Sequence, residues 1–258
     1  MRALSVPAVP VLDQESIDYQ RELSKDARER KWPNVVPRDA ATLILLDRSG
    51  PEPKVLMGRR HPGLTFLPGK YLVPGGRIEP GDRDMHCAGE LPEALAPRLL
   101  AGPGRPGRAK ARALALAAIR ETFEETGILL GRRAAATAPA PEGAWRDFSA
   151  HGVLPDLSRL HFVARAITPP RRPKRFDTRF FTMDASEIAH RIEGTVGPET
   201  ELVELVWQNV SETAKLDLPA ITHVVLKELA ARVAKGMDHA LPVPFFRELN
   251  WKWRRELL

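Results

Sequence analysis

Cysteine is almost absent from this chain of 258 residues, and tyrosine is nearly as scarce. The single cysteine, Cys87, excludes an internal disulfide and suits a reducing compartment. No apolar run approaches the roughly 20 residues of a membrane-spanning helix, and the first residues lack the basic start and long apolar segment of a secretory signal. Since 43% hydrophobic and 28% charged residues are ordinary for a globular protein, we expect a folded cytoplasmic protein.

Positive charge exceeds negative charge, with 39 Lys and Arg against 33 Asp and Glu, a formal net charge of +6. This balance suits nucleic acid, an anionic membrane face or a phosphate-bearing small molecule as the partner. The basic residues gather in three clusters, at Arg105 to Arg112, Arg171 to Arg175 and Lys252 to Arg255. Each cluster is broken by Pro or Gly or lies near the last residue, so solvated surface charge is the simplest interpretation.

Short apolar runs separated by turn residues predict a sheet that begins near Ala40. Thr42–Leu46 and Lys54–Met57 flank a turn at residues 49–51 and predict a hairpin. A short strand is expected at Tyr71–Val73, before paired glycines. The later strands are expected at Leu160–Ile167, Phe176–Met183 and Glu201–Trp207.

Helical patterns alternate with these strands. The expected helices are Asp13–Lys31, Pro92–Leu100, Ala109–Thr126, Asp184–Arg191 and Pro219–Lys235. Strands and helices mixed in this order predict an α/β sandwich around a mixed sheet. We divide the chain into a helical lead-in segment over residues 1–38, one α/β domain over 39–235, and a tail over 236–258 that packs on the domain or on a partner subunit.

A cluster of glutamates marks the helix expected over Ala109–Thr126. At about 100° per residue, Glu121, Glu124 and Glu125 gather on one side of it and apolar residues lie opposite. Like charges at this spacing cost about 0.2–0.5 kcal/mol per pair, and Arg120 offsets only part of that. A divalent cation with oxygen ligands would relieve the repulsion and serve phosphate chemistry. On the helix alone, a solvated acidic face is the simpler interpretation.

A pair of glycines upstream, which we call the glycine corner, favours the interpretation that the glutamates bind a divalent cation. Gly75 and Gly76 end a short strand and precede an acidic loop that reaches Asp82. Glycine lets the backbone approach a ligand or metal closely, and it leaves a carbonyl free to act as an oxygen ligand. Taken without the glutamate helix, the glycine pair is only a turn.

Together the two segments resemble the signature of the Nudix family. That signature is Gly, five residues, Glu, seven residues, then Arg-Glu-U-x-Glu-Glu-x-Gly-U, where U is a bulky apolar residue. Here Gly76 is followed by five residues and Asp82, and the run Arg120 to Ile128 reads RETFEETGI. The resemblance covers about Asp39–Lys235 and implies a Nudix-type α/β/α sandwich around a mixed β-sheet.

The chain departs from that signature in three ways. Asp82 replaces the first Glu, Thr122 stands where a bulky apolar residue is usual, and Arg83–Ile119 supplies 37 residues where the family has seven. Because loop closure costs only about 0.6 kcal/mol per doubling of length, the two halves can still meet. A Nudix motif split by a long insertion resembles the motif of the family branch that includes a peroxisomal coenzyme A diphosphatase. This chain ends in Arg-Glu-Leu-Leu, which favours a cytoplasmic relative.

The resemblance implies metal-dependent hydrolysis of a diphosphate bond in a nucleoside diphosphate linked to another moiety, with Mg²⁺ or Mn²⁺ as the cofactor. Arg120 would orient the carboxylates, and Glu121 would hold the metal or help to activate water. The catalytic residues implied in this way are Arg120, Glu121, Glu124 and Glu125. The metal ligands implied are the carbonyl of Gly76, or of Gly75, with Glu121, Glu124 and Glu125.

The general base often lies outside the motif in this family. Glu199, Glu201 and Glu204 lie near the start of an expected strand, and we take Glu201 as the candidate. A solvated carboxylate is the alternative interpretation of each.

Coenzyme A (CoA) carries an adenosine 3′-phosphate besides its diphosphate, so a site for it needs extra cations. The expected substrate-binding residues are Arg59, Arg60 and Lys70, with Arg171, Arg172 and Lys174 as further cations. CoA-specific Nudix enzymes carry an Arg four residues before the glycine that is Gly69 here, a place that holds Thr65. The cations make CoA or acyl-CoA the first interpretation. The Thr at position 65 keeps ADP-ribose or a dinucleotide as the alternative.

The expected partners are a small nucleotide-diphosphate substrate and a second copy of the chain in a homodimer, with no membrane. The alternative of another class is a catalytically silent Nudix domain that binds nucleotide or RNA. Clustered carboxylates beside phosphates argue against it, so nucleic acid is not the favoured partner. The insertion over about 83–111 is expected to cover the substrate cleft or form a dimer contact, through Met85, Leu91, Leu95 and Leu99.

Overall fold

The structure is a computed structural model, and it describes residues 18, 21, 23, 31–101, 107–134 and 139–258. The helix expected over Asp13–Lys31 lies mostly outside these residues, although Asp18, Arg21 and Leu23 are helical. None of the described helices combines the length and the apolar character needed to cross a lipid bilayer.

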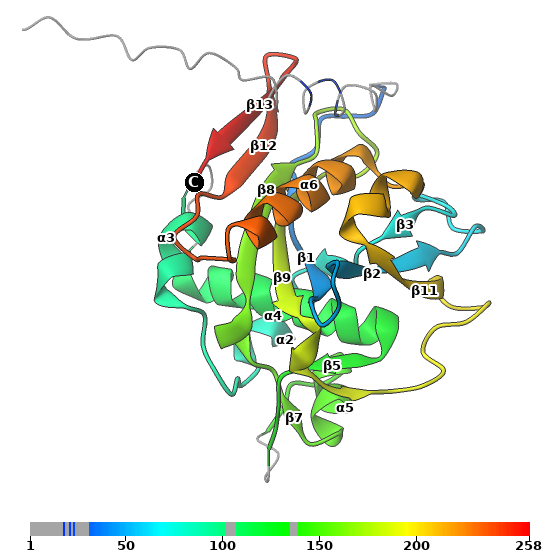
Figure 1. Cartoon of the computed structure of the whole chain (residues 1–258), viewed down its shortest axis with the longest axis vertical. Helices are drawn as coiled ribbons and strands as arrows, with labels where there is room; N and C mark the ends of the chain where they lie inside the picture. The colour runs from blue at the N-terminus through cyan, green and yellow to red at the C-terminus, as the bar shows by residue number, and fades with distance from the viewer. Residues whose placement is uncertain (1–17, 19–20, 22, 24–30, 102–106, 135–138) are drawn as a thin grey trace, which may run out of the picture.

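In the described part of the chain, nine strands form one mixed sheet (Figure 1). These strands are β1 (Arg38–Asp47), β2 (Lys54–Arg60), β3 (Tyr71–Leu72), β4 (Gly75–Arg77), β8 (His161–Ile167), β9 (Phe176–Asp184), β11 (Leu202–Asn209), β12 (Pro244–Leu249) and β13 (Lys252–Leu257). Their order is β11-β2-β1-β9-β8-β12-β13, while β3 pairs with β2 and β4 with β1. β1 is antiparallel to β2, as the predicted hairpin requires, and parallel to β9.

Helices and short strand pairs surround this sheet. The helices are α2 (Gly81–Asp84), α3 (Ala96–Leu99), α4 (Arg108–Thr126), α5 (Ala144–Ala150) and α6 (Ala220–Ala234). The 3₁₀ turns are η1 (Glu93–Leu95), η2 (Leu157–Arg159), η3 (Ala185–Glu187) and η4 (Val210–Lys215). The short pairs join β5 (Ile128–Leu130) to β10 (Ile188–Arg191), and β6 (Arg132–Arg133) to β7 (Val153–Leu154).

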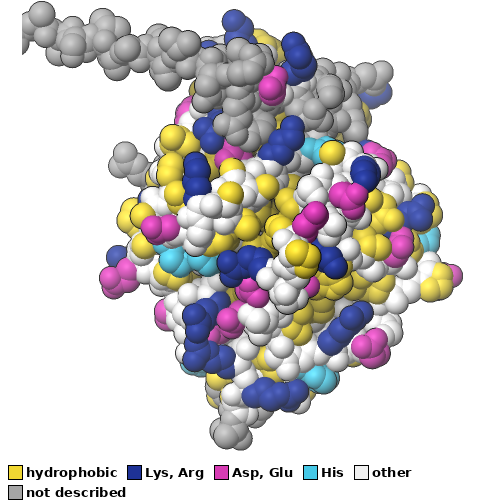
Figure 2. Space-filling view, in the orientation of Figure 1, with side chains coloured by type: hydrophobic (Ala, Val, Ile, Leu, Met, Phe, Trp, Pro, Cys, Tyr) yellow, Lys and Arg dark blue, Asp and Glu magenta, His cyan; other side chains and the backbone are white. Residues whose placement is uncertain are grey.

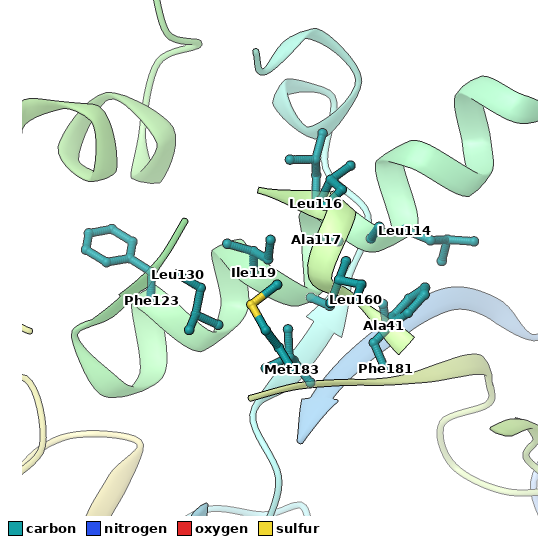
Figure 3. Packing of buried hydrophobic residues seen from close by; sticks show 14 of the residues in the cluster. Ala41, Leu114, Leu116, Ala117, Ile119, Phe123, Leu130, Leu160, Phe181 and Met183 are labelled. Atoms are coloured by element: carbon teal, nitrogen blue, oxygen red, sulfur yellow. The ribbon is translucent and has the colours of Figure 1, made fainter. Parts of the chain in front are cut away.

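Helix α4 covers one face of the sheet and α6 the other (Figure 1). Alternate residues of β1 point to the two layers, with Leu43 in the cluster under α4 and Ile44 in the cluster under α6. Figure 3 shows Phe181 and Met183 of β9 beside α4. A strand buried on both faces reads as a continuous apolar run, and the predicted α/β/α sandwich around a mixed sheet is confirmed.

Helix α4 is buried around most of its circumference, not on the single face that the sequence suggested. Every residue from Ala113 to Ile119 is fully buried, because the alanines let neighbouring elements approach closely. Its end is the predicted one: Gly127 has a φ of 71°, the left-handed conformation of a C-terminal cap, and donates its N–H to the carbonyl of Phe123.

The insertion is part of the core. Met85, Leu95 and Leu99 are each 1% exposed and belong to the cluster under α4, and Leu91 packs against it. The expectation that these side chains cover the cleft or meet a second subunit is therefore wrong. Arg112 of α4 holds the insertion in place, because its Nη2 donates to the carbonyl of Met85 at 2.8 Å.

Two segments differ from their predicted conformation. The helix expected over Asp184–Arg191 is wrong: Asp184 accepts from the N–H of Ser186 and caps the short turn η3, after which the chain pairs with β5 as strand β10. The tail contains a hairpin, β12 and β13, that the sequence did not predict. β12 lies parallel to β8 and buries Phe245 and Phe246.

Candidate active site

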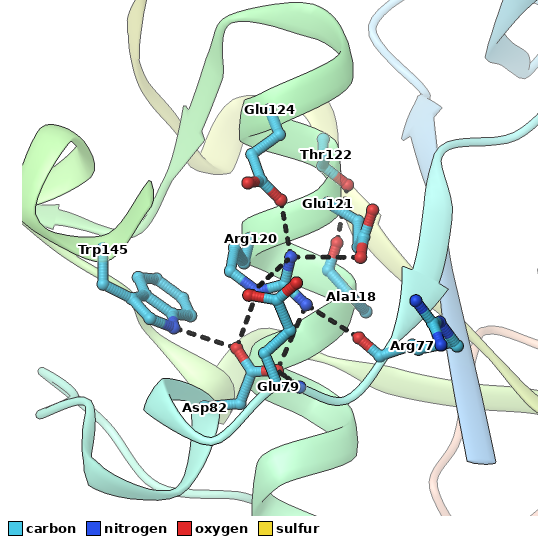
Figure 4. Close-up of polar contacts among 9 residues, drawn as sticks. All are labelled: Arg77, Glu79, Asp82, Ala118, Arg120, Glu121, Thr122, Glu124 and Trp145. Carbon is cyan, nitrogen blue, oxygen red and sulfur yellow. Dashed lines mark hydrogen bonds and ion pairs between the residues drawn. The ribbon is translucent and has the colours of Figure 1, made fainter. Parts of the chain in front are cut away.

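Arg120 is the centre of a polar cluster in the C-terminal half of α4 (Figure 4). Its side chain is 2% exposed, and its Nε and Nη2 donate to the two oxygens of Asp82 at 2.9 and 3.2 Å. Nη2 also donates to the carbonyl of Arg77 at 2.7 Å. Asp82 and Arg120 are 38 positions apart in the sequence, so the two halves of the split motif meet at this guanidinium.

The same guanidinium holds two of the motif glutamates. Nη1 lies 3.0 Å from Glu121 Oε1 and 2.5 Å from Glu124 Oε2. Burial alone would lower the pKa of Arg120, but the hydrogen bond and charge of Asp82, with the two glutamates, outweigh burial and raise it. Arg120 is thus a fixed positive charge with the contacts that an orienting role requires.

Asp82 is itself anchored from two further sides. It is fully buried and accepts from Trp145 Nε1 at 2.9 Å and from the N–H of Glu79 at 2.7 Å. The sequence analysis missed Trp145, which lies 63 positions away on α5. The available signal was chemical: a buried indole N–H needs an acceptor, and an unpaired buried acid needs a donor.

Glu121 packs against the glycine corner. A Cβ placed on Gly76 would lie 2.3 Å from Glu121 Oε1, so a side chain at this position would displace the carboxylate. Burial raises the pKa of Glu121 to about 7, with Arg120 opposing the rise and Glu124 adding to it. The structure therefore brings together the corner and the glutamate that the sequence singled out.

Glu125 lies on the wall of a cavity of about 740 Å³. Gly75 donates its backbone N–H to this carboxylate, yet burial, followed by the charges of Glu121 and Glu201, holds the pKa of Glu125 well above its usual range. Gly75, Gly76 and Glu201 line the same cavity. Two carboxylates thus line one partly open cavity.

The donor chemistry of this cluster fits a hard divalent cation. Three carboxylates lie on one turn of α4, and burial and mutual repulsion raise the pKa of Glu121 and of Glu125; oxygen ligands of this kind suit Mg²⁺ or Mn²⁺. Among the described residues, no three His, Cys, Asp or Glu side chains stand at metal-holding distances. Arg120 instead neutralises Glu121 and Glu124, so a cation would compete with it for them.

The expected substrate-binding residues divide into two groups. Arg60 and Lys70 line the cavity, and each has an acidic partner, Glu201 for Arg60 and Asp217 for Lys70. Arg59 is exposed and lies outside the described lining. The later cations that reach the lining are Arg172 and Lys174.

The three candidates for the general base also separate. Glu199 is exposed, and Glu204 accepts from the hydroxyl of Tyr71 at 3.1 Å. Glu201 lines the cavity that Glu125 faces. Its carboxylate is held by Arg60, whose Nε also donates to the carbonyl of Phe66.

The fold and site define an α/β/α sandwich around a mixed sheet, with an arginine-anchored glutamate cluster at a cavity. No protein-family model matches the sequence. The crystal structure of a Nudix hydrolase from Alicyclobacillus acidocaldarius is 30% identical, and the match covers 76% of this chain and 92% of that chain with a TM-score of 0.56. The chain belongs to the Nudix hydrolase family.

Two curated relatives carry a more specific name. The human acyl-coenzyme A diphosphatase NUDT19 is 28% identical over 210 residues, which are 63% of this chain and 55% of the relative. The chicken protein of the same name is 28% identical over 216 residues, 60% of this chain and 55% of the relative. The chain thus spans about half the length of the curated relatives that it matches.

Proposed function

We propose that this protein hydrolyses the diphosphate bond of CoA or acyl-CoA with the help of Mg²⁺ or Mn²⁺. The observation that carries the proposal is that Glu121 and Glu125 meet the glycine corner while Arg120 holds Glu121 and Glu124, beside a cavity that the cations Arg60 and Lys70 line. The choice of CoA is supported by the names of the human and chicken relatives.

The roles of the residues follow from their positions. Glu121, Glu124 and Glu125 would hold the metal, with a carbonyl of the glycine corner, and Arg120 would position the first two of these carboxylates. A bound divalent cation supplies neutralisation of charge on phosphorus and a lower pKa for water. Glu201 stands at the wall of the same cavity and would accept the proton of the attacking water.

The direct test incubates the protein with CoA and Mg²⁺ and identifies the products. Adenosine 3′,5′-bisphosphate and 4′-phosphopantetheine are expected. Glu125→Gln should lower kcat/KM at least 100-fold, because the variant loses an anionic ligand for the cation that would neutralise the phosphates; this scale is on the order of other electrostatic catalytic groups. The exposed Glu199 provides the control, Glu199→Gln, which should keep its activity. Near-normal turnover by Glu125→Gln would refute the assignment.

ADP-ribose or a dinucleotide is the second candidate substrate. The observation that favours it is the exposed Thr65, where the resemblance to CoA-specific enzymes calls for Arg. Release of AMP from ADP-ribose at a higher kcat/KM than the cleavage of CoA would select this alternative.

Silent binding of nucleotide or RNA has less support. The basic cluster at residues 105–112 contains Lys110 and Arg112, which pair with Asp39 and Glu90. Figure 2 shows cationic and acidic side chains interspersed over the visible face, not one continuous basic surface. Hydrolysis-free binding of oligonucleotides that weakens steeply with salt would revive this function. The homodimer and the cytoplasmic location stay predictions.

A further inference from the structure

The cavity at Glu125 extends across the sheet into an apolar region. Glu201 precedes the edge strand β11, whereas Trp253 lies on β13 at the other edge, and both line the cavity. Between them it crosses β1, β9 and β8 on the α6 face. From β2 to β8 there are three strand spacings, roughly 14 Å, which is longer than a single nucleobase needs.

The lining of this region is aliphatic and aromatic. Ala166 and Phe180 form its floor and are buried, while Trp32, Ile221 and Trp253 come from three separate parts of the chain. Trp32 precedes the sheet, Ile221 lies in the first turn of α6 and Trp253 in the C-terminal hairpin. An apolar ligand group in this region would be removed from water on several sides.

One hydrogen-bonding group near the carboxylates lacks a protein partner among the described residues. Thr42 Oγ1 is buried without a protein partner, and Thr42 lies beside Gly75 near the carboxylates. A polar ligand atom there would satisfy it. The hydroxyl of Thr168 accepts from the N–H of Phe176.

Two cations also line the cavity. Arg172 and Lys174 lie on the loop between β8 and β9, and Lys174 Nζ stands 5.0 Å from the centre of the Phe66 ring. The Phe66 ring with adjacent cations suits the adenosine 3′-phosphate end of CoA, because the ring can stack on the base and the cations can pair with the phosphate. An acyl-CoA molecule with its adenosine end at these cations would leave its acyl chain to the apolar side chains.

We propose that the apolar region binds the acyl chain of acyl-CoA, and that Trp32, Ile221 and Trp253 determine the preference for acyl-CoA over free CoA. The inference rests on the proposed function and adds to it which end of the substrate the cavity selects. The parts of the chain that form the acyl pocket are those outside the motif: the segment before the sheet, the start of α6 and the C-terminal hairpin.

A series of saturated acyl-CoA substrates tests the proposal. kcat/KM should rise with chain length, by about three- to fourfold for each methylene that becomes fully buried, and level off when the region is full. In Trp253→Ala the ratio of kcat/KM for palmitoyl-CoA to that for CoA should fall at least tenfold. Trp251→Ala is the matched control, because Trp251 is 64% exposed on the same hairpin and lies outside the described lining; it should keep the ratio.

A second variant tests the proposal even if Trp253→Ala fails to fold. Ile221→Phe narrows the region without removing a side chain, so palmitoyl-CoA should lose more kcat/KM than acetyl-CoA does. Equal losses for both substrates would overturn the proposal. It would equally be overturned if Trp253→Ala weakened inhibition by adenosine 3′,5′-bisphosphate instead of inhibition by palmitoyl-phosphopantetheine, since the region would then hold adenosine.

Binding in EDTA separates this inference from the proposed function. Without divalent metal, the wild-type protein should bind palmitoyl-CoA at least tenfold more tightly than CoA, as measured by calorimetry, and Trp253→Ala should reduce that difference. Equal affinities would defeat the acyl pocket. If neither CoA nor palmitoyl-CoA were cleaved in Mg²⁺ despite tighter palmitoyl-CoA binding, the proposed function alone would be defeated.

Discussion

The buried pair of Asp82 and Arg120 joins the two halves of the split motif, and its removal should be costly. Asp82→Asn leaves the guanidinium buried with its main counter-charge gone, so we expect a loss of about 3 kcal/mol in the free energy of unfolding. Urea denaturation followed by tryptophan fluorescence measures it, with the exposed Asp84 as the control, in Asp84→Asn. A loss equal to that of the control would show that the pair contributes little.

Gly76 should matter for activity more than for stability. The Cβ of Gly76→Ala would meet the carboxylate of Glu121, which is the flexible end of a side chain, and would push it from its position. We expect kcat/KM to fall roughly 100-fold, the scale of a displaced catalytic group, with an unfolding free energy within about 1 kcal/mol of wild type. The control is Gly50→Ala, at an exposed turn with open space around it. Full activity in Gly76→Ala would contradict the close approach seen here.

Individual site residues could be predicted only as far as the motif extended. Gly76, Glu121 and the orienting Arg120 are consecutive or regularly spaced in a known pattern, so the sequence singles them out. Trp145 and the pairing of Glu201 with Arg60 depend on contacts across 63 and 141 positions, for which no local pattern exists. The sequence indicated that Arg120 would orient the carboxylates, and the structure adds that one atom, Nη1, contacts both Glu121 and Glu124.

At the scale of elements, the insertion should behave as part of the core. Leu95 is 1% exposed in the cluster under α4, and Leu95→Ala should cost about 3 kcal/mol in the free energy of unfolding, as cavities in packed cores do. Glu93→Ala, at an exposed position of the same turn, should change it by less than about 0.5 kcal/mol. Equal small effects in chemical denaturation would mean that the insertion is only a surface loop.

Local patterns predicted the elements whose burial is complete, and failed where pairing partners are distant. The predictions for β1 and α4 were correct, since a strand buried on both faces and a capped helix have strong local signals. The segment Asp184–Arg191 was predicted as a helix from its local pattern, but pairing with β5 overrides that preference. Strand β12 was missed because its neighbour, β8, precedes it by about 80 positions.

At the scale of the whole molecule, the chain beyond the motif completes the sandwich. The C-terminal hairpin extends the sheet beside β8, and the loop before it closes over the end of the same strand. There His161 of β8 and His239 stack, with ring centres 4.2 Å apart and planes 12° apart. Contact between two histidines from segments so far apart makes global stability sensitive to pH.

Burial, with the neighbouring His239, Arg232 and Arg48, lowers the pKa of His161 to about 4. The folded state thus takes up a proton at lower pH than the unfolded state, whose histidine has a pKa near 6.5. Stability should be full above about pH 6.5, fall as the pH drops toward 4, and change no further below that through this group. Discounted for partial exposure, the loss between pH 7.5 and 5 should be about 1–2 kcal/mol.

Urea denaturation at these two pH values checks the expectation. His161→Gln should lose less stability than wild type on acidification, because the variant lacks the imidazole of His161, whose protonation opposes folding. His86→Gln, at an exposed position of the insertion, should retain the wild-type dependence. If wild type and His161→Gln lost the same stability on acidification, His161 would not be the source of the dependence. Glu121 and Glu125 could not account for it either, because their pKa values are raised in the folded state, so that acid stabilises the fold through them.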